Sequence, residues 1–183
     1  MKAWNKRPVA MAVLAVVVVL SVLVGSHRSV AALRQQTDLV FTQGERGDGL
    51  SIAHDLETRT ELASNLIVVA RRYVDSGDAS LVQLRAAADA LLQAESRSAK
   101  YQANRELDLA FQEVYGMLEG KALSQQDSEY RTRLNADFKS SNAKISHDSY
   151  NQLAQQFNED VLGAFPGGRL AAATGVRPLE LYR

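Results

Sequence analysis

The stretch VAMAVLAVVVVLSVLV, Val9 to Val24, contains no charged residue and a single polar residue, Ser21. Together with Gly25 it reaches the lower end of the roughly 17–25 residues that a transmembrane helix needs. Valine is a mediocre helix former in water, but a segment inside lipid must satisfy its backbone hydrogen bonds internally and therefore becomes helical. We predict that residues 9–25 are a transmembrane anchor, with the membrane lipid bilayer as the first partner of the chain.

A cleaved signal peptide is the alternative reading of the same segment. It would share the basic start, but its apolar core usually has only about 7–15 residues. Ser29-Val30-Ala31 has the small residues of a cleavage site. Cleavage there would release an exported soluble helical domain, with a ligand-binding or sensor-type role. The length of the apolar run favours an anchor.

The distribution of charge predicts the orientation of the anchor. Lys2, Lys6 and Arg7 lie in the basic tail, residues 1–8, and outnumber Arg28 and Arg34 beyond the anchor. The positive-inside rule then places the N-terminus in the cytoplasm and the C-terminal domain on the exported side of the cell membrane. Without these three bases the chain has 18 basic and 21 acidic residues, which argues against nucleic acid as a partner.

Proline and glycine divide the rest of the chain into segments. Between Pro8 and Pro166 no proline interrupts a helix, and GERGDG at residues 44–49 has three glycines in six positions. We therefore expect a helical stalk over residues 26–43, a glycine-rich linker at 44–49 and a helical bundle over 50–165. An irregular C-terminal tail should follow over 166–183.

Apolar residues recur at helical spacing throughout the expected bundle. The pattern predicts helices over about 50–75, 79–119 and 124–164, with a polar stretch near residues 95–106 that could kink the second of them. Asp78 and Ser124 are the expected N-caps. The fold class is therefore all-α: an N-terminal transmembrane helix followed by an elongated antiparallel bundle of three to four long helices. The expected apolar stripes are Leu62, Leu66, Val69 and Tyr73; Leu81, Leu84, Ala88 and Leu91; Leu107, Phe111, Val114 and Leu118; and Tyr130, Leu134, Phe138, Ile145, Leu153, Phe157 and Val161.

No catalytic constellation emerges, and we predict no catalytic, cofactor-binding or metal-binding residues. His54-Asp55 and His147-Asp148 suggest a metal hydrolase, but neighbouring helix residues point about 100° apart and cannot easily ligate one ion. The chain has no cysteine, which excludes disulfides and thiol catalysis. Arg71-Arg72-Tyr73 could contact lipid headgroups or an acidic partner, although basic residues also suit a helix C-terminus.

The stretch YNQLAQQFNEDVLGAFPGG, Tyr150 to Gly168, repeats an aromatic–Asn pair after seven residues. Tyr150 and Phe157 would lie on one face of a helix, with Asn151 and Asn158 beside it. Because asparagine is unfavourable inside a helix, we predict that both amides form hydrogen bonds to a neighbouring helix at the bundle seam.

Through Tyr150-Asn151, Phe157-Asn158 and Phe165-Pro166, the chain resembles the LemA family of bacterial proteins. The segment SNLIVVARRYV, Ser64 to Val74, is similar to the Pro-Asn-Leu-Val segment of that family, with Ser64 in place of the proline. The resemblance implies a membrane-attached, all-helical envelope protein without established catalytic activity. It also implies an envelope protein partner, such as a membrane protease, because some relatives are encoded beside membrane metalloproteases.

Overall fold

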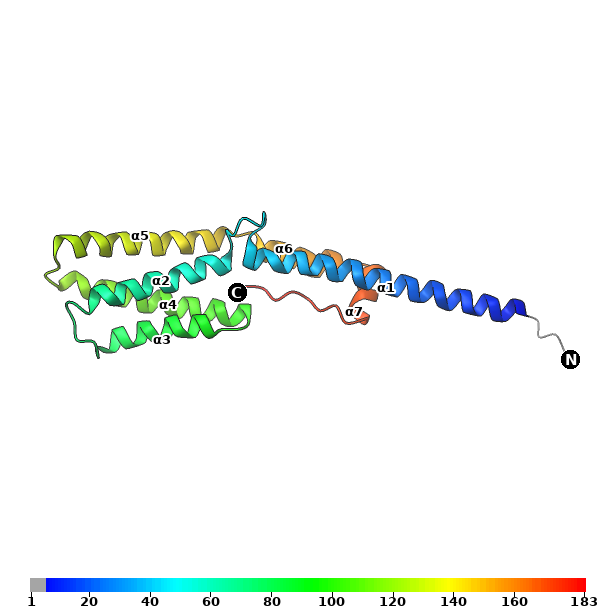
Figure 1. Ribbon diagram of the computed structural model, residues 1–183, viewed down its shortest axis with the longest axis horizontal. Coiled ribbons are helices and arrows are strands. Elements are labelled where there is room, and N and C mark those ends of the chain that lie inside the picture. The colour runs from blue at the N-terminus through cyan, green and yellow to red at the C-terminus, as the bar shows by residue number, and fades with distance from the viewer. Residues whose placement is uncertain (1–5) are drawn as a thin grey trace. The chain divides into compact units, whose positions relative to one another are not determined.

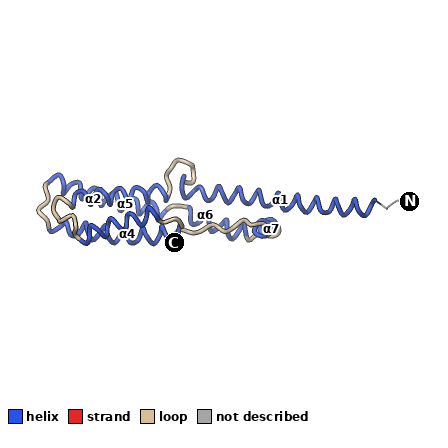
Figure 2. The backbone as a smooth tube through the Cα atoms, turned by 60° about the horizontal axis from the view of Figure 1, so that its bottom comes forward, coloured by secondary structure: helices blue, strands red, loops and turns tan. Residues whose placement is uncertain are grey.

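The computed structural model describes residues 6–183, so residues 1–5 of the expected basic tail lie outside it. The described part of the chain is helical and contains no β-strand (Figures 1 and 2). The all-α prediction is therefore confirmed. In chain order the helices are α1 Lys6–Gln43, α2 Ile52–Ala70, α3 Ala79–Gln93, α4 Arg97–Met117, the 3₁₀ turn η1 Leu118–Gly120, α5 Gln125–His147, α6 Tyr150–Gln156, the π-helical segment η2 Phe157–Leu162 and α7 Gly167–Ala173.

The chain forms two compact units, and each of them combines segments that are distant in sequence. The bundle unit comprises residues 39–151 and 180–183, and the anchor unit comprises residues 6–38 and 152–179. This division differs from the single bundle expected over 50–165. The expected irregular tail at 166–183 is also wrong in part, because it contains α7 and contributes residues to both units.

Helices α2, α3, α4 and α5 form an antiparallel bundle with short connections (Figure 1). Helix α2 packs against the other three, and α3 packs against α4. The apolar stripes predicted for α2, α3 and α4 are buried except for Tyr73, which is half-buried. Tyr130 departs further from its predicted stripe, because 39% of its surface is exposed.

An arginine lies in the centre of this bundle. Arg59 on α2 has no exposed surface. Its Nη2 contacts the Asp108 carboxylate at 2.7 Å, and its Nη1 donates to the Phe138 carbonyl at 3.0 Å. The guanidinium also lies 3.8 Å from the centroid of the Phe138 ring, which stacks on Phe111. Burial lowers the pKa of Arg59, and the hydrogen bond and charge of Asp108 oppose that shift.

Two of the expected long helices are each broken, the first of them at the start of the polar stretch that could hold a kink. The segment expected over 79–119 is interrupted at residues 94–96, so α3 and α4 pack side by side. The hydroxyl of Ser96 caps α4 by accepting from the backbone N–H of Ala99 at 3.1 Å. The segment expected over 124–164 is interrupted at Asp148 and Ser149, where the Asp148 side chain accepts from the Tyr150 N–H. At each break, a side chain thus caps the start of the next helix, and neither break contains glycine or proline.

The caps predicted for α3 and α5 are confirmed. Asp78 accepts from the Ser80 N–H, and Ser124 accepts from the Asp127 N–H.

The glycine-rich linker at residues 44–49 separates α1 from α2, as expected. Its first residue, Gly44, has a φ of 80°. A Cβ atom at Gly44 would lie 2.2 Å from the Leu50 carbonyl oxygen. Both the left-handed backbone and this close approach require glycine at that position.

In the anchor unit, α1 carries an apolar surface that no other part of residues 6–183 covers. The side chains of Val9, Met11, Val13 and most of their apolar neighbours to Val24 are about half or more exposed. Helix α1 is long and apolar enough to cross a membrane. Beyond the apolar stretch it contacts the rest of the unit, and His27 Nδ1 lies 2.9 Å from the Thr174 hydroxyl next to α7. Arg34 donates to the Arg177 carbonyl at 2.7 Å.

Candidate functional sites

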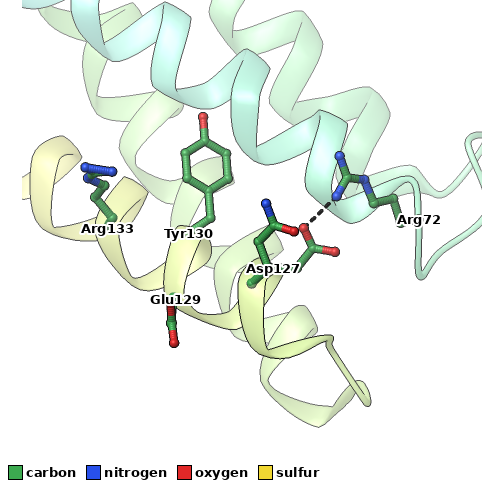
Figure 3. Close-up of a pocket in the computed structure, with 6 residues that line it drawn as sticks. Arg72, Asp127, Glu129, Tyr130 and Arg133 are labelled. Carbon is green, nitrogen blue, oxygen red and sulfur yellow. Dashed lines mark hydrogen bonds and ion pairs between the residues drawn. The ribbon is translucent and has the colours of Figure 1, made fainter.

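A surface pocket of about 580 Å³ opens beside the end of α2 and the first turns of α5 (Figure 3). It is lined by Arg72, Gln126, Asp127, Glu129, Tyr130 and Arg133. Figure 3 shows the ring of Tyr130 between Arg133 and Asp127, with Glu129 pointing away from Arg72. The lining therefore mixes both signs of charge and does not form a dedicated anion site.

Asp127 organises one side of this pocket. Arg72 Nη1 lies 2.6 Å from one of its carboxylate oxygens, and the Tyr73 hydroxyl donates to the other at 2.5 Å. The Tyr73 hydroxyl also accepts from the backbone N–H of Ser124, so it joins the connection after α2 to the start of α5. The hydrogen bond from Tyr73, followed by the contacts of Arg72, lowers the pKa of Asp127. The acidic contact considered for Arg71-Arg72-Tyr73 is thus found within the chain itself.

The two His-Asp pairs have structural partners. Asp55 is buried and lies 3.9 Å from Lys144 Nζ, while His147 Nδ1 lies 2.7 Å from the Ala143 carbonyl oxygen. Burial raises the pKa of both Asp55 and Asp148. Among residues 6–183, no three histidine, aspartate or glutamate side chains are grouped so that they could hold a metal ion.

The first asparagine of the repeat binds the last residues of the chain. The Asn151 amide donates to the Tyr182 carbonyl at 2.8 Å and accepts from the Tyr182 N–H at 2.8 Å. The neighbouring Tyr150 hydroxyl donates to the Glu180 carbonyl at 2.6 Å. These contacts lie inside the bundle unit. They satisfy both backbone groups of Tyr182, whose side chain packs against Phe41 and Tyr101.

The second asparagine makes the same pair of contacts inside the anchor unit. Asn158 donates to the Leu179 carbonyl at 2.9 Å and accepts from the Leu179 N–H at 2.7 Å. The predicted bonds between helices are therefore wrong in their partner, because both amides bind the non-helical C-terminal segment. Seven helical residues advance about 10.5 Å and three extended residues about 10 Å, so the two spacings match.

Glu180 attaches the same C-terminal segment to α4. Its carboxylate accepts from the backbone N–H groups of Arg97 and Ser98, the latter at 3.0 Å. These bonds lower the pKa of Glu180 because they favour the charged form. Burial raises the pKa of Tyr182 to about 12. The chain end thus caps a helix that starts more than 80 residues earlier, a contact that no local sequence signal indicates.

A second surface hollow, of about 590 Å³, lies between α2 and α3. Three carboxylates, Glu57, Glu61 and Asp89, line it together with the half-exposed Leu92. Neither this hollow nor the pocket at Asp127 presents a nucleophile paired with a base or a set of ligands for a cofactor.

Comparison with protein-family models, with curated proteins and with solved structures gave no match to this chain. The resemblance to the LemA family therefore rests on the motif residues alone. Of these residues, Tyr150, Asn151 and Asn158 hold the C-terminal segment, and Phe157 is buried. Phe165 stands apart, because 88% of its surface is exposed.

Proposed function

We propose that this protein is a membrane-anchored, non-enzymatic helical interaction module of the bacterial envelope, related to the LemA family. The observation that carries the proposal is the apolar surface of α1. Between Val9 and Val24 its side chains are about half or more exposed on nearly every side, and no residue of the described chain covers them. Contact with water would be costly at about 25 cal/mol per Å² of apolar surface, so a lipid environment fits this segment.

The contacts beyond the apolar segment favour a retained anchor over a cleaved signal. Helix α1 runs without a break through Ser29, Val30 and Ala31. Val30 is 9% exposed and His27 contacts Thr174, so both belong to the packed part of the anchor unit. Cleavage after Ala31 would remove residues that the folded unit uses.

The orientation we propose has the N-terminus in the cytoplasm and the helical bundle on the exported side, from the distribution of basic residues. Protease digestion of intact and osmotically opened cells tests it. The bundle should be digested in both if it is exposed outside, and only after opening if it faces a periplasm. Protection of the bundle in both preparations would contradict an exported domain.

Anchoring is tested separately by N-terminal sequencing and alkaline extraction of membranes. We expect the mature chain to keep residues 9–25 and to stay with the membrane in alkaline carbonate. A mature N-terminus at Ala32 together with a soluble chain would instead support the exported soluble alternative.

The interaction role calls for a partner in the envelope, and a membrane protease is the class that the family resemblance suggests. Photo-crosslinking groups at the exposed positions Val82, Leu92 and Leu109 would capture such a partner in native membranes. Gln83 provides a polar control beside Val82. We expect a discrete adduct from at least one apolar position, and its absence from all three would count against an interaction role.

Metal analysis tests the non-enzymatic part of the proposal. The purified chain and its H54A and H147A variants should hold equally little zinc or manganese. Stoichiometric metal that is lost on either substitution would instead support a hydrolytic site at the His-Asp pairs.

A further inference from the structure

The turn between η2 and α7 presents an apolar side chain to its surroundings. Phe165 is 88% exposed, whereas the large apolar side chains from Val9 to Val24 that are exposed range from 49% to 68%. Pro166 beside it and Arg169 on α7 are also exposed. The rest of the anchor unit therefore leaves the ring of Phe165 uncovered.

The anchor unit holds this turn close to the end of the membrane segment. Thr174, just after α7, contacts His27, which lies two residues beyond Gly25 and so about 3 Å further along the helix axis. Figure 1 shows α7 beside α1. Helix α7 has seven residues, so it is only about 10 Å long, and Phe165 lies two residues before its start. The headgroup layer on each side of the hydrocarbon core is itself several ångströms thick.

The position of Phe165 is fixed by packing rather than left to a loose loop. A Cβ atom at Gly168 would lie 1.9 Å from the Val161 carbonyl oxygen, so α7 lies directly against η2. The backbone N–H of Arg169 donates to the Ala164 carbonyl at 3.0 Å, and its Nε donates to the Gly163 carbonyl at 3.1 Å. These contacts close the turn on the inside and leave the phenyl ring on the outside.

We infer that Phe165 inserts into the headgroup region of the bilayer that holds residues 9–25, with the exposed Arg169 near the lipid phosphates. The inference rests on the proposed membrane anchoring. Its physical basis is that two uncovered apolar surfaces belong to one unit, in which the contact between His27 and Thr174 holds α7 beside the end of the membrane segment. Aromatic residues suit the boundary between headgroups and acyl chains, and a guanidinium binds phosphate oxygens.

Tryptophan fluorescence of the full chain in phospholipid vesicles tests this inference. Trp4 is the single native tryptophan, so a W4F background allows one reporter at a time. The variant F165W keeps an aromatic ring at the site. V17W reports on the anchor, and Q155W on α6 is the matched exposed control within the same unit. Gln155 lies far from the membrane segment. Leu153 and Gln156, on either side of it in the sequence, line a surface cavity together with Thr37. Thr37 is twelve residues, or about 18 Å, beyond Gly25 along α1.

Phospholipids brominated at the headgroup end of their acyl chains should quench F165W but not Q155W. Phospholipids brominated near the methyl end of their acyl chains should quench V17W, because Val17 lies about 12 Å from either end of residues 9–25. Water-soluble acrylamide should quench Q155W several-fold more strongly than F165W. Equal acrylamide quenching of F165W and Q155W, without quenching by brominated lipid, would overturn the inference while V17W still reports an intact anchor. Protection of F165W from both quenchers would also overturn it and indicate a protein contact. Failure of the lipid brominated near the methyl end to quench V17W would instead refute the anchor itself, and the inference with it.

Discussion

At the scale of single residues, Arg59 shows that a search for apolar periodicity misses buried charged residues. It lies three residues before Leu62 and seven before Leu66, so it shares their buried face of α2. A search for apolar residues alone skips it, although its position in the stripe was readable from the sequence. Its partner Asp108 follows the buried Leu107 on another helix, and nothing in the local sequence links the two.

Removing either member of the Arg59–Asp108 pair should have unequal consequences. D108A leaves a fully buried guanidinium without its anion, whereas R59M replaces the charge with an apolar chain and leaves only a carboxylate that is 45% exposed. We expect D108A to lower the free energy of unfolding by about 1–3 kcal/mol. R59M should cost less, because a buried ion pair can be replaced by apolar packing at small cost. Urea denaturation measures both, and a larger loss in R59M would contradict this account.

Asp127 should make stability depend on acid pH. Its pKa is lower in the folded chain than the ordinary 3.8 because Tyr73 and Arg72 favour the carboxylate. A group of this kind stabilises the fold above its unfolded pKa and loses that contribution as the pH falls through its folded pKa. The melting temperature of D127N should therefore lie below that of the unmodified chain at pH 6, and the gap should narrow below pH 4. The exposed Asp137 on the same helix is the control, and a gap independent of pH would exclude this mechanism.

At the scale of secondary structure, the buried faces were more predictable than the helix ends. The stripes of α3 and α4 follow directly from spacing, and the caps Asp78 and Ser124 have the expected chemistry. The polar stretch near residues 95–106 indicated a kink, but the full break before α4 was not predicted. It depends on Ser96 and on the distant Glu180, which together bind the first N–H groups of that helix. Helix ends that rely on tertiary contacts carry only a weak local signal.

The asparagine repeat yields a prediction about the C-terminal segment. N151A leaves the N–H and C=O groups of Tyr182 without their side-chain partner, and N158A does the same at Leu179. Each substitution should lower the free energy of unfolding by about 1–3 kcal/mol. N151D keeps an acceptor for the Tyr182 N–H but loses the donor, and it should be as damaging or worse because a carboxylate then faces a carbonyl.

The matched control for the repeat is the double variant Q155A/Q156A, since both glutamines are exposed on the same helix. Surface substitutions of this kind usually change stability by less than about 0.5 kcal/mol. Chemical denaturation of the variants compares them directly. Effects on N151A and N158A as small as those on the glutamine pair would show that the amide contacts do not hold the segment.

At the scale of the whole molecule, the two units could not be read from linear segments. The sequence placed boundaries at GERGDG and at Pro166, where the chain does turn. Each unit nevertheless includes residues from both the early and the late parts of the chain. Asn151 and Asn158 were the only indication in the sequence of how the C-terminal segment packs, because a repeated polar residue beside a buried face needs hydrogen-bond partners. The partner proved to be an extended segment, which has no periodicity to detect.

Residues 26–31 of α1 should contribute to the stability of the anchor unit. A chain starting at Ser26 keeps His27 and Val30, whereas a chain starting at Ala32 loses both and their contacts with the rest of the anchor unit. Burial of one valine side chain contributes about 1.5–3 kcal/mol, so the longer chain should melt on the order of 5 °C higher. Circular dichroism of the two chains in aqueous buffer measures this difference, and the H27A variant of the longer chain isolates the contact with Thr174. Equal melting temperatures would mean that residues 26–31 add nothing to the folded unit, which is what a chain evolved for cleavage after Ala31 requires.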